Sequence, residues 1–255
     1  YFSAVEYLSC VGINSNVEGC YYEAGHVLGA ATISINIRQD GQNHRVIFSG
    51  DIGEPHRPII NDPTLFDEAE YIVMESTYGD RTHEEHENTD IQKQLRDCIN
   101  RTVSAGGNII VPSFALERSQ EMLYHLNELF LRKEIPPLPV FLDSPMAIRI
   151  TEVFKHHAEL FDKEMMQRLR QGNSFFNFEN LRIVQTEEES RAIKDVKKSC
   201  IIVAGSGMVN GGRIKYHIVN NITRPESTIL FVGYQAEGTP GRILLDGAKE
   251  IRLLG

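Results

Sequence analysis

From about residue 90 onward, one unit recurs along the chain: a short β-branched run, a small polar loop and a stretch of helical periodicity. The apolar runs do not alternate with polar residues, which is typical of parallel strands buried on both faces. This recurrence predicts an α/β fold with a mainly parallel, doubly wound sheet. The five expected strands are residues 108–111, 139–142, 181–184, 200–203 and 228–232.

Two of the helices between these strands have clear boundary signals. The helix after the first strand carries an apolar stripe from Leu116 to Phe130, and we expect Pro136 to end it. Thr186 and Glu189 have the spacing of a capping box, so a second helix should begin directly after Thr186.

The first 79 residues follow a different pattern. Residues 31–37 and 45–48 alternate as a half-exposed antiparallel pair does, and a tight turn separates them. Residues 71–74 predict another strand, which ends at Glu75. Because the parallel-strand recurrence begins only later, we place a domain boundary between residues 79 and 80.

Charge and cysteine content limit the class of protein. The formal net charge of −9 argues against binding nucleic acid through a broadly basic surface, although a locally positive groove remains compatible with it. No apolar run is long enough for a membrane span, and no secretory signal is recognisable. The four cysteines form no C-x-x-C pair, so we expect reduced, buried thiols and a cytoplasmic protein.

One histidine and one aspartate flank the open end of the expected strand pair. His26 comes just before the pair and Asp51 just after it, so the two side chains should converge. An imidazole and a carboxylate suit zinc or a similar divalent ion. The competing interpretation is a core histidine hydrogen-bonded to a carboxylate, which spacing alone favours because a metal site needs more ligands.

The expected parallel strands all end in small polar loops. Ligands bind outside the carboxyl ends of such strands, where small residues let backbone amides approach an anion. Arginines follow four of these loops, which would suit a run of phosphates, although any single one could be an ordinary surface residue. The candidate phosphate-binding residues are Ser113, Arg118, Ser144, Arg149, Ser206, Gly207, Arg213 and Arg242.

Seven motifs, taken in order, resemble the β-CASP branch of the metallo-β-lactamase superfamily. That branch includes bacterial and archaeal RNases, RNase J and the endonuclease subunit of the pre-mRNA 3′-end cleavage complex. The resemblance covers nearly the whole chain, and the ordered set is highly specific. The motifs are AGHVLGA from Ala24, FSGD from Phe48, MESTYG from Met74, PSFALERSQE from Pro112, DSPMA from Asp143, GSGM from Gly205 and GYQAEGT from Gly233.

The resemblance implies a role for each matched residue. Residues 1–79 would be the C-terminal part of a metallo-β-lactamase domain, and residues 80–255 the β-CASP domain. His26 matches a zinc ligand, Asp51 matches the aspartate that bridges two zinc ions, and Glu75 matches the acidic residue of the first β-CASP motif. Asp51 and Glu75 are therefore the catalytic candidates.

The same resemblance implies a zinc-dependent hydrolase of nucleic acid. Its substrate would be RNA, expected to be single-stranded and cut internally, with DNA as the alternative; a homodimer is a possible assembly and no membrane is involved. Ser76 and Thr77, which follow Glu75, would join the phosphate-binding residues, although in isolation this segment reads as a turn with a helix cap.

One departure from the family pattern matters. None of the nine histidines has the spacing of the family's main ligand motif, H-x-H-x-D-H, so we expect the chain to be a fragment, inactive alone, with an incomplete site. One alternative is a catalytically inactive scaffold subunit, against which the retention of His26, Asp51 and Glu75 speaks. The other is a nucleotide-binding doubly wound domain, but the G-x-G-x-x-G opening is missing.

Overall fold

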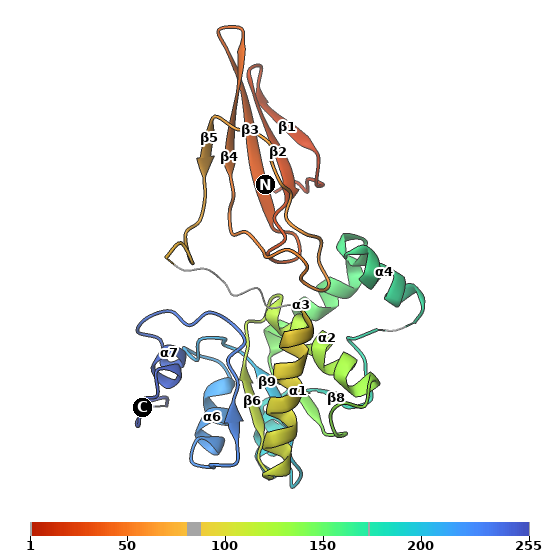
Figure 1. Cartoon of the computed structure of the whole chain (residues 1–255), viewed down its shortest axis with the longest axis vertical. Coiled ribbons are helices and arrows are strands. Elements are labelled where there is room, and N and C mark those ends of the chain that lie inside the picture. Colours follow the sequence, from red (N-terminus) through yellow and green to blue (C-terminus); the bar gives the residue numbers. More distant parts are fainter. Residues whose placement is uncertain (1, 81–87, 173, 255) are drawn as a thin grey trace. The chain divides into compact units, whose positions relative to one another are not determined.

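The computed structural model describes residues 2–80, 88–172 and 174–254 (Figure 1). They divide into two compact units: unit 1 holds the described residues up to Asn88 together with Ala158–Gln167, and unit 2 holds the remainder. The sequence pattern placed the boundary at 79/80 and did not anticipate the return of 158–167 to unit 1. That return has a physical basis, because Ile60 forms a β-bridge with Phe161 and both are buried.

Unit 1 contains a five-stranded sheet in the order β1-β2-β3-β4-β5. Its first four strands are antiparallel and β5 joins β4 in parallel. The expected strand pair is β3 and β4, and the expected third strand is β5. The strands β1 and β2 were not predicted; β1 is only five residues long and all of them are exposed, so it has no buried face. The bounds are β1 Cys10–Asn14, β2 Val17–Glu23, β3 Ala31–Gln39, β4 Gln42–Phe48 and β5 Tyr71–Val73.

A two-residue turn fixes the register of β3 against β4. Gln39 pairs with Gln42, which leaves Asp40 and Gly41 as the turn, with φ of 51° and 78°. Positive φ at both central residues is the type I′ geometry that matches the twist of a hairpin, and glycine adopts it without strain. The predicted tight turn is therefore observed.

The prediction that all four cysteines are reduced was wrong. Cys10 of β1 lies directly opposite Cys20 of β2, with 4.0 Å between their Cα atoms, and the two form a disulfide. The pairing was missed because neither strand was expected. Cys98 and Cys200 are free thiols. Burial raises the pKa of the Cys200 thiol to about 11, so this thiol stays protonated at neutral pH.

Unit 2 is built on a five-stranded, entirely parallel sheet in the order β10-β6-β9-β7-β8, which confirms the predicted α/β class. Every residue of β6 and β9 is buried. Ile110 and Ile202 pack in one cluster with Ile214 and Ile218, so the neighbouring residues of these strands face the opposite side. The strands are β6 Ile109–Pro112, β7 Val140–Leu142, β8 Leu181–Ile183, β9 Ile201–Ala204 and β10 Thr228–Ile229.

Helices and two short 3-10 turns connect these strands. The predicted capping box at Thr186 is present, with the Glu189 amide donating to the Thr186 hydroxyl. Within the described ranges, every helix is too short or too polar to cross a membrane. The helices are α1 Asn88–Ser104, α2 Arg118–Leu131, α3 Pro145–His156, η1 Ala158–Leu160, α4 Lys163–Arg170, α5 Glu187–Ala192, η2 Ile193–Asp195, α6 Ile214–Asn221 and α7 Pro240–Leu245.

Candidate functional site

His26 and Asp51 lie side by side in unit 1. Atom Nε2 of His26 is 3.8 Å from Oδ2 of Asp51, and their side chains are 38% and 73% exposed. The β3–β4 pairing explains this approach, because the loop before β3 and the loop after β4 leave the same end of the hairpin. The expected convergence of the two side chains is therefore observed, and their exposure is unlike that of a core histidine pair.

Two glycines allow the loops that carry these side chains to touch. The Gly53 amide donates to the Ala24 carbonyl over 2.9 Å. A Cβ atom on Gly53 would lie 1.5 Å from the Gly25 carbonyl oxygen, closer than any atomic contact permits. Gly25 itself has φ of +64°, a conformation that glycine tolerates best. The two backbones can meet here because Gly53 carries no side chain.

Glu75 ties the Asp51 loop to the end of β5. Its Oε1 accepts a hydrogen bond from the Ile52 amide and its Oε2 accepts one from the Thr77 hydroxyl, both over 2.6 Å. The Thr77 hydrogen bond is the main reason why the pKa of Glu75 is lowered. Burial opposes it, and the Ile52 amide and the charge of His26 lower the pKa further. Glu75 is therefore a carboxylate that positions the residue next to Asp51.

The segment after Glu75 is a turn, as its composition indicated. The Gly79 amide donates to the Ser76 carbonyl over 3.0 Å. Both Ser76 and Thr77 are exposed, and of the two hydroxyls considered for phosphate binding it is that of Thr77 which Glu75 engages.

The donors at this site fit zinc in type but not in number. Imidazole nitrogen and carboxylate oxygen are common zinc ligands, and 3.8 Å is a separation that one cation can bridge. Among the residues that the structure describes, no third histidine, cysteine or carboxylate joins His26 and Asp51 in a compact group. A zinc site needs three or four ligands, so this pair can form only part of one.

The polar loops of unit 2 meet at the carboxyl ends of adjacent strands. Ser113 follows β6, Ser144 follows β7, and Gly205 follows β9, which lies between them. A Cβ atom on Gly205 would lie 3.3 Å from the Ser144 hydroxyl and 3.8 Å from the Ser113 carbonyl. The structure therefore brings these three predicted loops together at one edge of the sheet.

The serine hydroxyls in these loops already have intramolecular partners. Ser113 is fully buried and its hydroxyl accepts a hydrogen bond from Ser119. Ser144 caps α3 by accepting from the Ala147 amide, and Ser206 accepts from the Gly211 amide. Gly207 has a packing role, because a Cβ there would lie 2.6 Å from the Phe114 ring. These contacts shape the loops, which leaves the backbone and the loop surfaces as the parts that could meet an anion.

Three of the four candidate arginines are paired with carboxylates. Arg118 contacts Glu121 over 2.6 Å, Arg213 contacts Asp143 over 2.7 Å, and Arg242 contacts Asp246 over 2.9 Å. Each partner cancels part of the positive potential that the loops were expected to supply. Arg149, on α3, is exposed.

A buried carboxylate organises this end of unit 2, and sequence reasoning missed its role. Asp143 is fully buried; it accepts hydrogen bonds from Arg213, from the Ser190 hydroxyl over 2.5 Å and from His217 Nε2 over 2.6 Å. Burial alone would raise the pKa of Asp143, but these partners outweigh it and the pKa is lowered. The only sequence signal for this role was an aspartate directly after an expected buried strand. Its partner His217 lies 74 residues further along the chain, so the contact could not be expected from local spacing.

Comparison with known proteins agrees with this architecture. The Beta-Casp domain family matches residues 119–244. The chain is 33% identical to Ribonuclease TTHA0252 of Thermus thermophilus over 91% of its length, which covers 52% of that relative. It is 30% identical to the RNase J-like protein of Methanocaldococcus jannaschii, covering 98% of the chain and 58% of the relative. It is also 32% identical to Transcription termination factor FttA of Methanosarcina mazei, of which it covers 39%. The chain thus spans about half the length of these relatives.

Proposed function

Because the chain belongs to the β-CASP family of the metallo-β-lactamase superfamily, we propose that it is part of a metal-dependent hydrolase that cuts phosphodiester bonds in RNA. The observation that carries the proposal is the pair His26 and Asp51, whose ligand atoms lie 3.8 Å apart at the open end of a hairpin. Two of the relatives are named as a ribonuclease and an RNase J-like protein, which supports RNA as the substrate class.

In this proposal, His26 Nε2 and the Asp51 carboxylate contribute to a two-zinc centre that further ligands complete. Divalent zinc, when bound, stabilises negative charge on the phosphate and makes water a stronger nucleophile at neutral pH. Glu75 holds the Asp51 loop through the Ile52 amide and remains ionised because its pKa is lowered. The protein's own contribution is therefore to place two ligands and to keep their loops fixed.

Substrate binding would use the loops at the carboxyl edge of the unit 2 sheet. The exposed guanidinium of Arg149 and the backbone around Ser144 and Gly205 offer contacts to a phosphate backbone. The net charge of −9 predicts modest non-specific affinity, since the 35 acidic side chains outnumber the 26 basic ones. Single-stranded RNA cut at internal positions is the proposed reaction.

The decisive experiment replaces Asp51 with alanine in the full-length protein. We expect cleavage of a labelled single-stranded RNA to fall at least about 100-fold, because a lost ligand removes several kcal/mol of metal-derived stabilisation. Asp67→Ala is the matched control, since Asp67 is also an exposed aspartate of unit 1. Zinc content and thermal unfolding would be measured on both variants.

The outcomes of this experiment separate the alternatives. Unchanged cleavage by the Asp51→Ala protein would remove Asp51 from the mechanism. A wild-type protein that binds zinc yet leaves every RNA substrate intact would favour the catalytically inactive scaffold. Loss of cleavage in the Asp51→Ala protein alone, with unfolding unchanged, supports the nuclease.

A second prediction concerns Glu75. The Glu75→Gln side chain can still accept from the Ile52 amide, but its amide nitrogen cannot accept from the Thr77 hydroxyl. We expect the zinc concentration needed for half-maximal cleavage to rise about 10-fold, the lower end of the range for groups that orient ligands. Glu68→Gln, at another exposed glutamate of unit 1, should leave this concentration unchanged. An equal shift in both variants would contradict the positioning role.

A further inference from the structure

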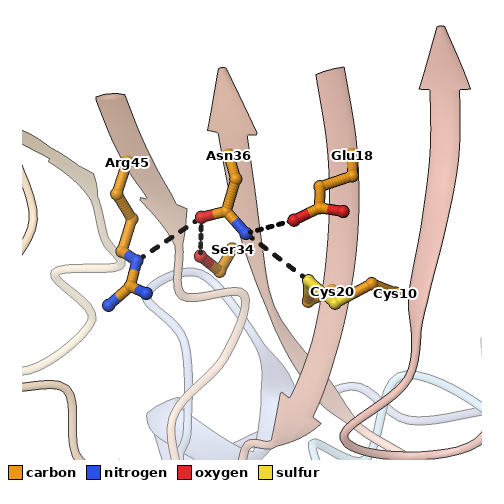
Figure 2. Close-up of a disulfide and its surroundings, with 6 residues drawn as sticks. All are labelled: Cys10, Glu18, Cys20, Ser34, Asn36 and Arg45. Carbon is orange, nitrogen blue, oxygen red and sulfur yellow. Dashed lines mark hydrogen bonds between the residues drawn. A yellow bond between two sulfur atoms is a disulfide. The ribbon is translucent and has the colours of Figure 1, made fainter. Parts of the chain in front are cut away.

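The disulfide of unit 1 has a carboxylate beside it. Cys10, Cys20 and Glu18 offer two sulfur atoms and a carboxylate oxygen that all lie within 4.8 Å of one another. The register explains this grouping: Cys10 is opposite Cys20, and Glu18 precedes Cys20 by two residues, which places both on one face of β2. Figure 2 shows the disulfide and the Glu18 side chain on the same side of the strands.

We propose that Cys10, Cys20 and Glu18 form a binding site for a thiophilic divalent cation such as zinc, which becomes available when the disulfide is reduced. This group was the only such cluster of three or more ligands within the described residues. It is separate from the proposed nuclease site, because it includes neither His26 nor Asp51. Its two thiolates also give it a softer ligand set than that pair.

The strand geometry suits three-fold coordination. Zinc binds thiolate sulfur at about 2.3 Å in a tetrahedral arrangement, which places two sulfur ligands about 3.8 Å apart. Opposed residues whose Cα atoms are 4.0 Å apart can reach that separation by rotation about their Cα–Cβ bonds. Glu18 would supply the third ligand, and water or another group would take the fourth position.

Asn36 of β3 is placed to orient two of the ligands. Its Nδ2 donates to Glu18 Oε1 over 3.2 Å and contacts Cys20 Sγ over 3.6 Å, as Figure 2 shows. Its Oδ1 accepts in turn from Arg45 Nε over 3.5 Å, which fixes the amide in this orientation. The Asn36 side chain therefore contacts both the Glu18 carboxylate and the Cys20 sulfur and orients them relative to each other.

Burial and charge also favour a cation here. Cys20 is 1% exposed, whereas Cys10 and Glu18 are exposed, so the group has a protected inner ligand and an open route from solvent. Two thiolates and one carboxylate carry three negative charges against the two positive charges of the ion. Arg45, next to Asn36, offsets the remaining negative charge.

Opening the site requires a reductant and releases protons. A dithiol reductant transfers two electrons and two protons to the Cys10–Cys20 bond, which breaks to give two thiols while the reductant becomes a disulfide. The cation then displaces both thiol protons and binds the thiolates. Once the cation has left, a small-molecule disulfide accepts two electrons and two protons from the two thiols, becomes a dithiol, and the Cys10–Cys20 bond re-forms. Occupancy of the site would therefore follow the redox state.

The test uses the intact chain and cobalt(II) as a spectroscopic probe. The protein is reduced with a phosphine, which becomes the phosphine oxide, and is then titrated anaerobically with cobalt(II). We expect thiolate-to-cobalt charge-transfer absorption that saturates at one ion per chain. The oxidised chain should lack this absorption, because its two sulfur atoms are bonded to each other.

Variants identify the ligands. Cys10→Ser and Cys20→Ser should each abolish the absorption, and Glu18→Gln should weaken cobalt binding at least about 10-fold. Cys98→Ser is the matched control, because Cys98 is a free thiol outside the group, and it should retain the absorption. The double variant His26→Ala, Asp51→Ala should also retain it, which separates this site from the nuclease proposal.

Two results would overturn the proposal. Charge-transfer absorption that survives in the Cys10→Ser protein would mean that the probe binds other thiols. Four reactive thiols in the denatured, oxidised chain, where two are expected, would show that the Cys10–Cys20 disulfide does not form.

Discussion

Replacing Asp143 with alanine is expected to lower the free energy of unfolding of unit 2 by about 3–5 kcal/mol. The change removes the acceptor of three hydrogen bonds and leaves the Arg213 guanidinium, 18% exposed, without its carboxylate. It also leaves His217, whose side chain is 4% exposed, without its carboxylate partner. The cost is large because buried polar groups lose their partner and cannot regain water. Urea unfolding followed by circular dichroism measures it.

The matched control is Asp246→Ala. Asp246 also pairs with an arginine, Arg242, but the two side chains are 59% and 35% exposed. Exposed ion pairs contribute up to about 1 kcal/mol, so this variant should unfold almost as the wild type does. Similar losses in the two variants would show that burial of the Asp143 network is not what gives it strength.

The contribution of Asp143 to stability should also depend on pH. The pKa of Asp143 is lower in the folded protein than its ordinary value of 3.8. Its contribution is therefore fully present above the unfolded pKa and is lost as pH falls through the folded value. We expect the wild type to lose stability below about pH 4 more steeply than Asp143→Asn, whose amide does not titrate in this range.

The strands of unit 2 could be predicted because their signals are local. Runs such as residues 109–111 and 201–203 are apolar throughout, and a parallel strand buried on both faces requires that composition. The order of the strands has no such local signal. The Asp143–His217 contact depends on that order and on 74 residues of intervening chain, so it became visible only in the structure.

The candidate site of unit 1 was likewise predictable where it depends on local sequence signals, and not where it depends on long-range strand pairing. A hairpin brings its flanking residues together whatever surrounds it, which is why His26 and Asp51 could be paired from spacing alone. The hydrogen bond from the Ile52 amide to Glu75 depends on β5 joining β4 in parallel, a long-range pairing. The Cys10–Cys20 bond likewise depends on the register of two strands with little apolar signal.

Gly53→Ala should disrupt the candidate metal site without touching a ligand. The new Cβ would lie 1.5 Å from the Gly25 carbonyl oxygen and 2.1 Å from its carbon, so the loop after β4 must move away from the loop before β3. Because both obstacles are backbone atoms, no side-chain rotation relieves the overlap. We expect a loss of about 3 kcal/mol in the free energy of unfolding, as severe overpacking costs.

The same movement separates His26 from Asp51, and a displacement of about 1 Å is enough to reduce catalysis about 100-fold. RNA cleavage by the full-length Gly53→Ala protein should therefore fall to the level of Asp51→Ala, with zinc affinity reduced as well. Gly12→Ala is the matched control, because Gly12 has no atom within 4 Å of the added Cβ. Full activity in Gly53→Ala would mean that the touching loops are not what holds the two ligands together.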